Sequence, residues 1–541
     1  MKSNRSVMKH NFGTTPAMRA PRSQFDRSHG VKTTFDTDYL IPFYVDEVLP
    51  GDTFNLSATI LARLATPEFP IMDNMYLDTM YFYVPNRLLW TNWEKFQGAQ
   101  DNPGDSVAFT IPQMVSTAVT GYLAGSLHDY MGLPTEVPDL SHSSLWHRAH
   151  NRIYNDWVRD ENLQGDIVVD VDNGTDSPTD YVLLRRGKRL DYITGCLPSP
   201  QKGSTAVSLP LGTVAPVSGI YTRGTVQSKP ADGIAYDAAG NTFTSTAVNG
   251  FWQISSDTSP PLSYIRHNVN DVVSATNLPQ VFADLTNATA ATINQLRQAE
   301  MVQELLERDA RGGTRYVEAL KSRFGVTSPD FRLQRSEYLG GGSQRVNVTP
   351  VPQTSVSAAT PQGNLAGYGT VVAHNQGFVK SFVEHGVIIG FLNVRADLTY
   401  QQNLEKMWSR STRYDFYEPI LANLGEQAVL KQEVEAVGSA GTTDDDVFGY
   451  QERWSEYRFK SSKITGQFKS NYATSLDSWH LAQDFAGTPP SLNAAFIVSD
   501  TPLDRAIVVP TGPHFIADIY INLKCARPMP VNSIPSLTRR F

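Results

Sequence analysis

Three histidines lie close together in the chain and have the chemistry of metal ligands. His147 and His150 are three residues apart, a spacing that places two side chains on one face of a helix, and His142 shortly precedes them. A zinc hydrolase of the HExxH type would add a glutamate between its histidines, and the chain has no such motif. The pattern favours histidines at a surface or a subunit interface, so we predict no metal site and no cofactor.

Two acidic segments contain carboxylates at a density that could bind a cation. The segment DVDNGTD (Asp170 to Asp176) is similar to the start of a calcium loop, but Gly174 occupies the fifth loop position and Tyr181 the twelfth, where oxygen ligands belong. We therefore predict a turn there. The run Asp444 to Asp446 predicts a solvated loop, with a divalent ion shared between subunits as the alternative.

No other motif indicates catalysis. The glycine-rich segments GGTRY (312–316) and GGGSQR (340–345) lack the GK[ST] ending of a phosphate-binding loop, and no GxSxG serine elbow is present. Gly340 to Gly342 instead predict a flexible turn. Cys196 and Cys525 are the only cysteines, which excludes a disulfide framework and indicates a reducing cytoplasm. We expect a protein that is not an enzyme.

The two ends of the chain are basic, whereas its middle is acidic. The formal net charge of the 541 residues is −8, yet residues 1–35 carry +6 and residues 524–541 carry +4, which leaves −18 between them. Basic ends on an acidic body suit a protein whose termini contact nucleic acid. The alternative is that these lysines and arginines only keep the ends soluble. The sequence shows neither a secretory signal nor an apolar run long enough for membrane insertion.

Several segments show the alternation of a strand with one buried face. Phe54, Leu56, Ala58 and Ile60 alternate with polar residues, and the same period runs from His514 to Cys525, with Cys525 on the apolar side as a buried, inert thiol. Residues 78–85 and 384–396 also predict strands. Because these strands lie far apart in sequence, their sheets need long insertions.

The insertions include four predicted helices, which cover residues 86–96, 145–160, 293–310 and 314–324. Gly325 is expected to end the last of them. Residues 203–285 differ in texture, because they are rich in Gly, Ser, Thr and Pro, carry few charges and contain short hairpin-like pieces. Their β-branched and aromatic residues favour a folded surface subdomain over a plain linker.

The segment GYQERWSEYRFK (Gly449 to Lys460) interleaves four aromatic residues with charged ones and fits neither a helix nor a strand period throughout. It closely resembles a segment of the major capsid protein of gokushoviruses, which are small single-stranded DNA phages of the Microviridae. The same resemblance is carried by PRSQFDRSHGVKTTFD, LARLATPEFPIMDNMYLDTMYFYVPNRLLWTNWEKF, RDARGGTRYVEALKSRFGVTSPD, EHGVIIGFLNVRADLTYQQ, LGEQAVL, SWHLAQDF and CARPMPV. It covers most of the chain except residues 203–285.

The resemblance implies a mainly β fold, an eight-stranded antiparallel jelly roll of the viral capsid type with large loop and helix insertions. Its parts would be a basic interior arm (1–35), strands with helical insertions (36–202), a protrusion at the threefold axis (203–285), and a helical insertion with the remaining strands and a basic tail (286–541). The alternative from another class is a β-sandwich that binds or cleaves polysaccharide.

The implied function is a T=1 icosahedral shell around a circular single-stranded DNA genome, built in the bacterial host cytoplasm and located in the virion. The implied partners are further copies of the chain, the genome, minor virion proteins and a host cell-surface receptor. The predicted DNA-facing basic residues are Arg5, Lys9, Arg19, Arg22, Arg27, Arg539 and Arg540. The predicted apolar contacts of the protrusion are Ile220, Tyr221, Phe251 and Trp252.

Overall fold

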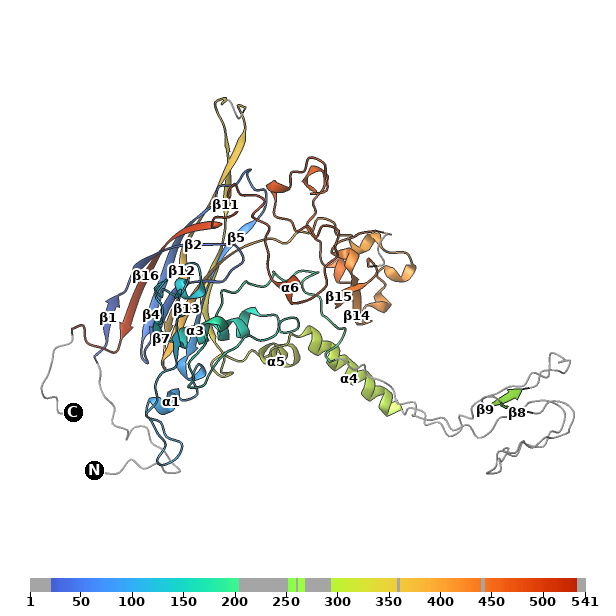
Figure 1. Cartoon of the computed structure of the whole chain (residues 1–541), viewed down its shortest axis with the longest axis horizontal. Coiled ribbons are helices and arrows are strands. Elements are labelled where there is room, and N and C mark those ends of the chain that lie inside the picture. The colour runs from blue at the N-terminus through green and yellow to red at the C-terminus, as the bar shows by residue number, and fades with distance from the viewer. Residues whose placement is uncertain are drawn as a thin grey trace. The chain divides into compact units, whose positions relative to one another are not determined.

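A computed structural model of the chain describes residues 21–203, 252–258, 261–267, 293–357, 361–438 and 443–532. The chain divides into two compact units, one formed by Met1–Lys202 with Glu307–Phe541 and the other by Gly203–Leu306. Figure 1 shows the elements of both units. The larger unit contains the two principal sheets.

The first principal sheet of the larger unit has six strands. Its strands are β1 (Ser23–Asp26), β2 (His29–Phe35), β4 (Thr53–Leu64), β11 (Asn347–Pro352), β12 (Leu365–Ser381) and β16 (Phe515–Arg527), in the order β1-β16-β4-β12-β11 with β2 also paired to β16. All of these pairings are antiparallel. Residues near the two ends of the chain therefore meet in one sheet.

The second principal sheet has four strands, again antiparallel. They are β3 (Ile41–Val48), β5 (Met75–Pro85), β10 (Glu337–Arg345) and β13 (Gly386–Ala396), in the order β10-β5-β13-β3. The mainly β, antiparallel architecture is thus confirmed. The sheets have six and four strands among the described residues, so the strand count of eight is not confirmed.

The two sheets face each other across the main hydrophobic core. Tyr81 of β5 packs on Phe378 of β12 with ring centroids 5.4 Å apart, and Phe382 lies between Phe54 of β4 and Tyr83 of β5. Along β16 every second residue from Phe515 to Cys525 is buried, as the alternation predicted. Fully burying one such aliphatic or aromatic side chain contributes about 1.5–3 kcal/mol, so this shared interior holds the sheets together.

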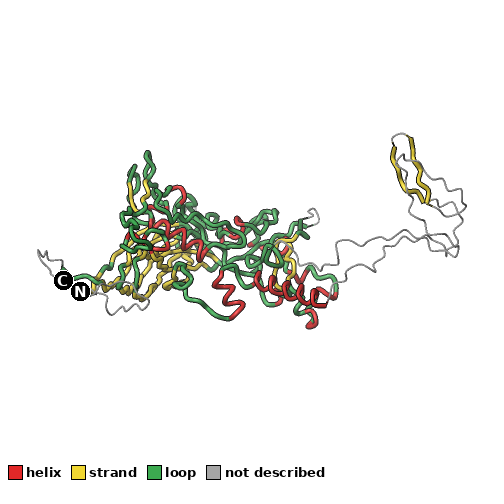
Figure 2. Tube along the Cα trace, turned by 90° about the horizontal axis from the view of Figure 1, so that it is seen from below, coloured by secondary structure: helices red, strands yellow, loops and turns green. Residues whose placement is uncertain are grey.

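The strands predicted from alternation form at the expected places. The segments containing Phe54 to Ile60 and residues 78–85 lie in β4 and β5, and β4 runs beside β16 with Ile60 opposite Ile519. Residues 384–396 form β13 from Gly386 onward. Figure 2 shows in yellow how most strands of the larger unit gather together, while green loops make up much of the rest of that unit.

The central strands of the second sheet, β5 and β13, are buried on both faces, which explains why β13 reads as a continuous apolar run. On the face turned away from the first sheet, Phe82, Val387 and Ile389 pack against Leu145 and Ile153 of α3. The helix α3 spans Leu145–Ile153, and Tyr154–Val158 continue it as one π-helical turn. The predicted helix over 145–160 is therefore present but shorter.

The other helices match the predictions unevenly. Residues 86–96 do not form one helix but a 3₁₀ turn (Asn86–Leu88) and the short α1 (Trp93–Phe96), because the chain turns to bury Trp90, whose Nε1 donates to Asn173 Oδ1 over 2.6 Å. The remaining α-helices are α2 (Leu127–Tyr130), α4 (Ile293–Arg311), α5 (Tyr316–Phe324) and α6 (Ala494–Ile497). Gly325 ends α5 in the left-handed region, as predicted.

The GGGS segment was predicted as a flexible turn, and this was wrong. Gly340 to Gly342 lie inside β10 and pair with β5. A Cβ atom on Gly341 would lie 2.0 Å from the carbonyl oxygen of Thr79, so the strands can approach only because the side chain is missing. Glycine here serves close packing rather than flexibility.

Three two-stranded ribbons complete the described strands. They are β6 (Gln113–Val115) with β7 (Ser141–Ser143), β8 (Trp252–Thr258) with β9 (Pro261–His267), and β14 (Glu426–Leu430) with β15 (Val447–Glu452). None of the helices in the described residues is long and apolar enough to cross a membrane.

Candidate functional site

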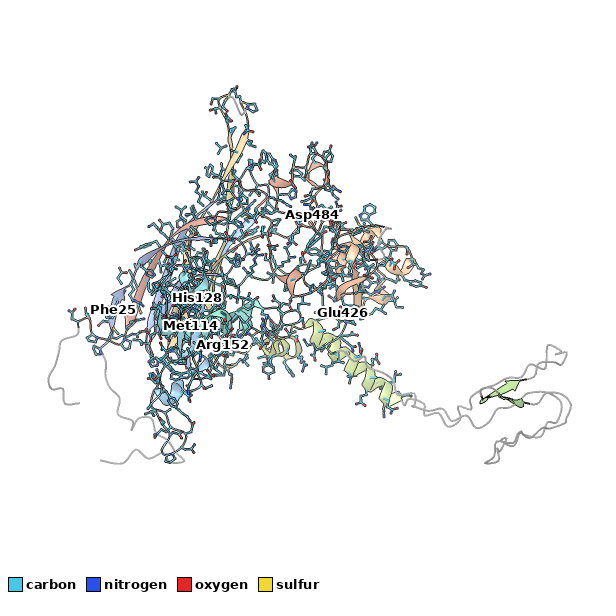
Figure 3. All side chains as sticks on the ribbon, viewed as in Figure 1. Phe25, Met114, His128, Arg152, Glu426 and Asp484 are labelled. Atoms are coloured by element: carbon cyan, nitrogen blue, oxygen red, sulfur yellow. The ribbon has the colours of Figure 1, made fainter. Side chains whose placement is uncertain are left out.

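The histidines do gather, but in the interior of the larger unit. His128 from α2 and His147 from α3 are joined by a hydrogen bond of 2.9 Å between Nδ1 of the first and Nε2 of the second. His142 from β7 lies with its ring 5.4 Å from that of His147 and accepts or donates a hydrogen bond of 2.7 Å with the Tyr122 hydroxyl. Figure 3 labels His128, which lies in the same part of the unit as Met114 of β6.

This burial corrects the expectation of surface or interface histidines. His147 and His150 are 2% and 1% exposed, and Nδ1 of His147 has no hydrogen-bond partner. Burial lowers the pKa of His128 and of His150 to about 4, and that of His147 well below its ordinary value. At neutral pH these rings are therefore uncharged parts of the core.

The sequence does not group His128 with the other three histidines, because His128 precedes His142 by 14 residues. The fold joins them by packing the short helix α2 against α3 and β7. No group of three or more His, Cys, Asp or Glu side chains within the described part of the chain is arranged to hold a metal ion. The histidine cluster thus acts as a packed joint between these three elements.

The acidic segment DVDNGTD belongs to the same joint. Asp176 is buried and accepts two hydrogen bonds from Arg148, of 2.7 Å from Nε and 2.5 Å from Nη2, and a third of 2.8 Å from the Tyr181 hydroxyl. Arg148 also donates to the carbonyl oxygens of Leu89 and Asp172. The segment forms a turn, as predicted, whose last carboxylate is committed to a buried guanidinium.

Both cysteines are buried free thiols. Burial raises the pKa of each thiol, and Cys525 accepts a hydrogen bond of 3.3 Å from Arg527 Nε. The prediction of a buried Cys525 is confirmed. Because a thiolate is the reactive form, neither cysteine is prepared for nucleophilic chemistry.

Two of the predicted DNA-facing residues lie within the described chain. Arg22 is exposed and donates to the Thr53 hydroxyl. Arg27 forms a two-pronged ion pair with Asp46 of β3, with distances of 2.6 and 2.9 Å. The part of the predicted arm from Ser23 to Phe35 forms β1 and β2, so it belongs to the sheet. Arg5, Lys9, Arg19, Arg539 and Arg540 lie outside the described residues, and a role of all seven toward DNA stays a prediction.

The predicted protrusion residues are mostly outside the described chain as well. Ile220, Tyr221 and Phe251 fall there, while Trp252 begins β8 and stands opposite His267 of β9. The smaller unit spans Gly203–Leu306 and contains this hairpin. Its proposed contacts at a threefold axis stay a prediction.

The segment GYQERWSEYRFK forms the end of β15 and a turn. Trp454 adopts the left-handed region with φ of 68° and is buried, and Ser455–Tyr457 form a 3₁₀ turn. This change from strand to turn explains why no single period fits the segment. The rings of Trp454 and Tyr457 both contact Tyr417, which belongs to the preceding loop.

These features define the class of the protein. Two facing antiparallel sheets with long loop and helix insertions are the architecture of a viral-capsid jelly roll. The polar clusters described above join elements of the fold, and they do not converge on a cleft as catalytic groups do.

Comparisons with known proteins agree with this class. The sequence profile of the family "Capsid protein (F protein)" matches residues 13–537. The chain is 47% identical to "Capsid protein VP1" of Bdellovibrio phage phiMH2K, 44% identical to that of Chlamydia phage 1 and 36% identical to that of Spiroplasma virus 4. Each alignment covers 98% or 99% of this chain and 98% of the relative.

The chain therefore belongs to the F-protein family of phage capsid proteins. The prediction of a major capsid protein of a small single-stranded DNA phage, of the Microviridae type, is confirmed, and so is the prediction that it is not an enzyme. The protein is a component of the virion. The polysaccharide-binding alternative finds no support in these comparisons.

Proposed function

We propose that the chain assembles with copies of itself into a T=1 icosahedral shell that encloses a circular single-stranded DNA genome, and that assembly takes place in the cytoplasm of the bacterial host. The observation that carries this proposal is the similarity to three phage capsid proteins over nearly the whole length of each. The two-sheet fold supports it, because its loops can form contacts between neighbours while the core stays intact.

Particle formation by the purified protein tests this proposal. Charge-detection mass spectrometry of the particles gives the number of copies, which in a T=1 shell is one per asymmetric unit of the icosahedron. Electron microscopy of the same sample checks the symmetry. A protein that remains a small oligomer under all assembly conditions, or a shell with another copy number, would contradict the proposal.

We propose further that the basic ends of the chain neutralise phosphates of the genome inside the shell. Replacing Arg5, Lys9 and Arg19 by glutamine should lower the DNA content per particle, because each lost cation removes a contact that is independent of sequence. The ratio of absorbance at 260 and 280 nm and the extracted DNA measure the content. Unchanged packaging would favour the alternative that these residues only keep the end soluble.

Residues 203–285 are proposed to form an outward protrusion at the threefold axis that attaches the particle to a receptor on the host. Their change in composition between well-matched flanks supports this, since a receptor-binding surface can vary without disturbing the core. Deleting the central part and closing the gap with a Gly-Ser linker should leave particles that adsorb poorly to host cells. Failure to assemble would indicate a structural role between subunits instead. Minor virion proteins complete the proposed set of partners.

A further inference from the structure

The loop of residues 406–424 exposes an unusual amount of apolar surface for a single chain. Ile420 is 86% exposed and Trp408 69%, and the loop presents further large side chains to solvent. The most exposed members, each between 49% and 86% exposed, are Trp408, Tyr414, Phe416, Tyr417, Ile420 and Leu424. We call these six residues the aromatic loop surface.

The loop is held in place although it contains no long helix or strand. Three 3₁₀ turns shape it: Lys406–Trp408, Arg413–Asp415 and Pro419–Leu421. From beneath, Trp454 Nε1 donates to the carbonyl oxygen of Leu421 over 3.2 Å, and the Tyr457 hydroxyl accepts from the backbone N–H of Tyr417 over 3.2 Å. The surface is thus ordered before any partner arrives, which lowers the entropic cost of binding.

An ion pair beneath the loop adds to this support. Arg410 and Glu456 lie 3.2 Å apart with only 10% of each side chain exposed, and the Arg410 guanidinium also lies 4.3 Å from the centre of the Tyr457 ring. The GYQERWSEYRFK segment therefore serves as the base on which the loop is mounted. Trp454, Glu456 and Tyr457 of this segment contact the loop. Trp408, Tyr414 and Ile420 of the loop are 60% or more exposed.

The exposed area is large enough for a stable contact. The four aromatic residues are between 49% and 69% exposed, which corresponds to roughly 350–600 Å² of their surface. The largest apolar patch on a typical monomeric protein is about 300–600 Å², so this one loop exposes as much aromatic surface as such a patch contains. With Ile420 and Leu424 added, the surface approaches the roughly 800 Å² that each partner contributes to a standard protein interface.

The charge of the loop argues for a protein partner over nucleic acid. Residues 406–424 carry three basic and two acidic side chains. Two of the basic ones already have carboxylate partners, because Lys406 lies 3.0 Å from Glu433 and Arg410 is paired with Glu456. Surfaces that bind single-stranded DNA combine stacking aromatics with a strongly positive groove. Ile420 and Leu424, moreover, have no π face on which a base could stack.

We propose that the aromatic loop surface packs against a neighbouring copy of the same chain in the shell. The inference rests on the proposed shell function, in which every subunit contacts identical neighbours through heterologous surfaces. Apolar and aromatic residues over a rigid base, surrounded by charged groups, match the composition of the energetically dominant centre of a protein interface. Each subunit inserts this loop into the contact with its neighbour.

Chemical labelling tests this burial directly. Because both native cysteines are buried, an Ile420→Cys variant carries a single accessible thiol. Maleimide should modify it readily in unassembled subunits and at least about tenfold more slowly in particles, since a packed interface excludes the reagent. The wild-type protein gives the background rate. Equal rates in subunits and particles would overturn the proposal.

DNA-free particles separate a protein neighbour from the genome as the cover. Protection of the Ile420→Cys thiol should persist in particles assembled without DNA. If protection appears only in DNA-filled particles, nucleic acid covers the loop and the proposal fails. If the wild-type protein forms no particles at all, the shell function itself fails, which is a distinguishable result.

A charge substitution adds an assembly readout. Ile420→Asp should reduce the particle yield at least about tenfold while the circular dichroism and thermal unfolding of the subunit stay unchanged, because the exposed side chain stabilises only the contact with the neighbour. Val119→Asp is the matched control, since Val119 is 87% exposed and lies outside the loop. Assembly of Ile420→Asp at the wild-type yield would contradict the inference. If the Ile420→Asp variant misfolds, the labelling of the Ile420→Cys variant is the deciding test.

Discussion

Nδ1 of His128 lies 2.9 Å from Nε2 of His147, and this hydrogen bond joins two buried imidazole rings that come from different helices. The bond needs one of the facing nitrogens to donate and the other to accept, so at least one of the two rings must be neutral. Protonation of both rings would set two donors against each other. The stability of the joint between α2 and α3 is therefore tied to pH.

We expect the subunit to lose stability as the pH falls from about 6.5 toward 4. Burial lowers the pKa of His128 and His150 to about 4 from an unfolded value near 6.5, so the unfolded chain binds more protons in this window. The contribution of these neutral rings to the free energy of unfolding is complete above this window and is lost as the pH falls through it. For His150 alone the loss amounts to roughly 3 kcal/mol. Urea titrations of the unassembled subunit across this pH range measure it.

A His150→Gln variant isolates the contribution of His150 to the pH dependence of the free energy of unfolding. Glutamine does not titrate, so the urea midpoint should vary less with pH than it does in the wild-type subunit. His374→Gln is the control, because His374 is exposed and lies outside the buried histidine cluster. A His150→Gln subunit with the wild-type pH dependence would show that His150 is not the titrating group.

Removing one partner of the buried Arg148–Asp176 pair should destabilise the subunit by about 3–5 kcal/mol. Both side chains are essentially inaccessible to solvent, so Asp176→Asn removes the buried counter-charge of the Arg148 guanidinium and leaves only the exposed Asp172 carboxylate, 3.7 Å away. Urea unfolding measures the change in free energy. Lys32→Met is the contrast: Lys32 and Asp518 are 85% and 62% exposed at 4.0 Å, and losing that pair should cost less than about 1 kcal/mol.

Gly341→Ala should weaken the pairing of β10 with β5. The new methyl group would meet the Thr79 carbonyl oxygen at 2.0 Å, so the strands must separate or bend, at a cost of typically 1–3 kcal/mol. A lower melting temperature and faster amide exchange in β10 are the expected readouts. At Gly165 nothing lies within 4 Å of an added Cβ, so Gly165→Ala should leave the melting temperature nearly unchanged. Equal behaviour of the two variants would contradict the steric account.

Arg27→Gln should affect folding more than DNA content. Its guanidinium is already bound to Asp46, which also accepts a hydrogen bond of 2.8 Å from the Tyr44 hydroxyl. The substitution therefore mainly removes a partly buried ion pair. A double-mutant cycle with Asp46→Asn should give a coupling energy of about 1 kcal/mol. Additive effects of the two substitutions would mean that the pair contributes nothing to stability.

The sequence by itself determined the local features of this protein. Alternating apolar residues along β4 and β16 predicted both strands and the burial of Cys525, because a strand has a period of two and needs no knowledge of its partner. The helix end at Gly325 was predictable for a similar reason, since the left-handed conformation depends mainly on the residue itself. The family followed from motifs distributed over most of the chain.

Only the tertiary structure decided which distant residues meet. His128 and His147 share a hydrogen bond because two helices pack together, and no spacing along the chain reveals that contact. Arg27 is predicted from charge to face DNA, yet the sheet brings it to Asp46. Gly341 resembles part of a turn in sequence, but the close approach of β5 requires a residue without a side chain. Periodicity is a local property, whereas partners, burial and steric limits arise from contacts that form only when the chain has folded.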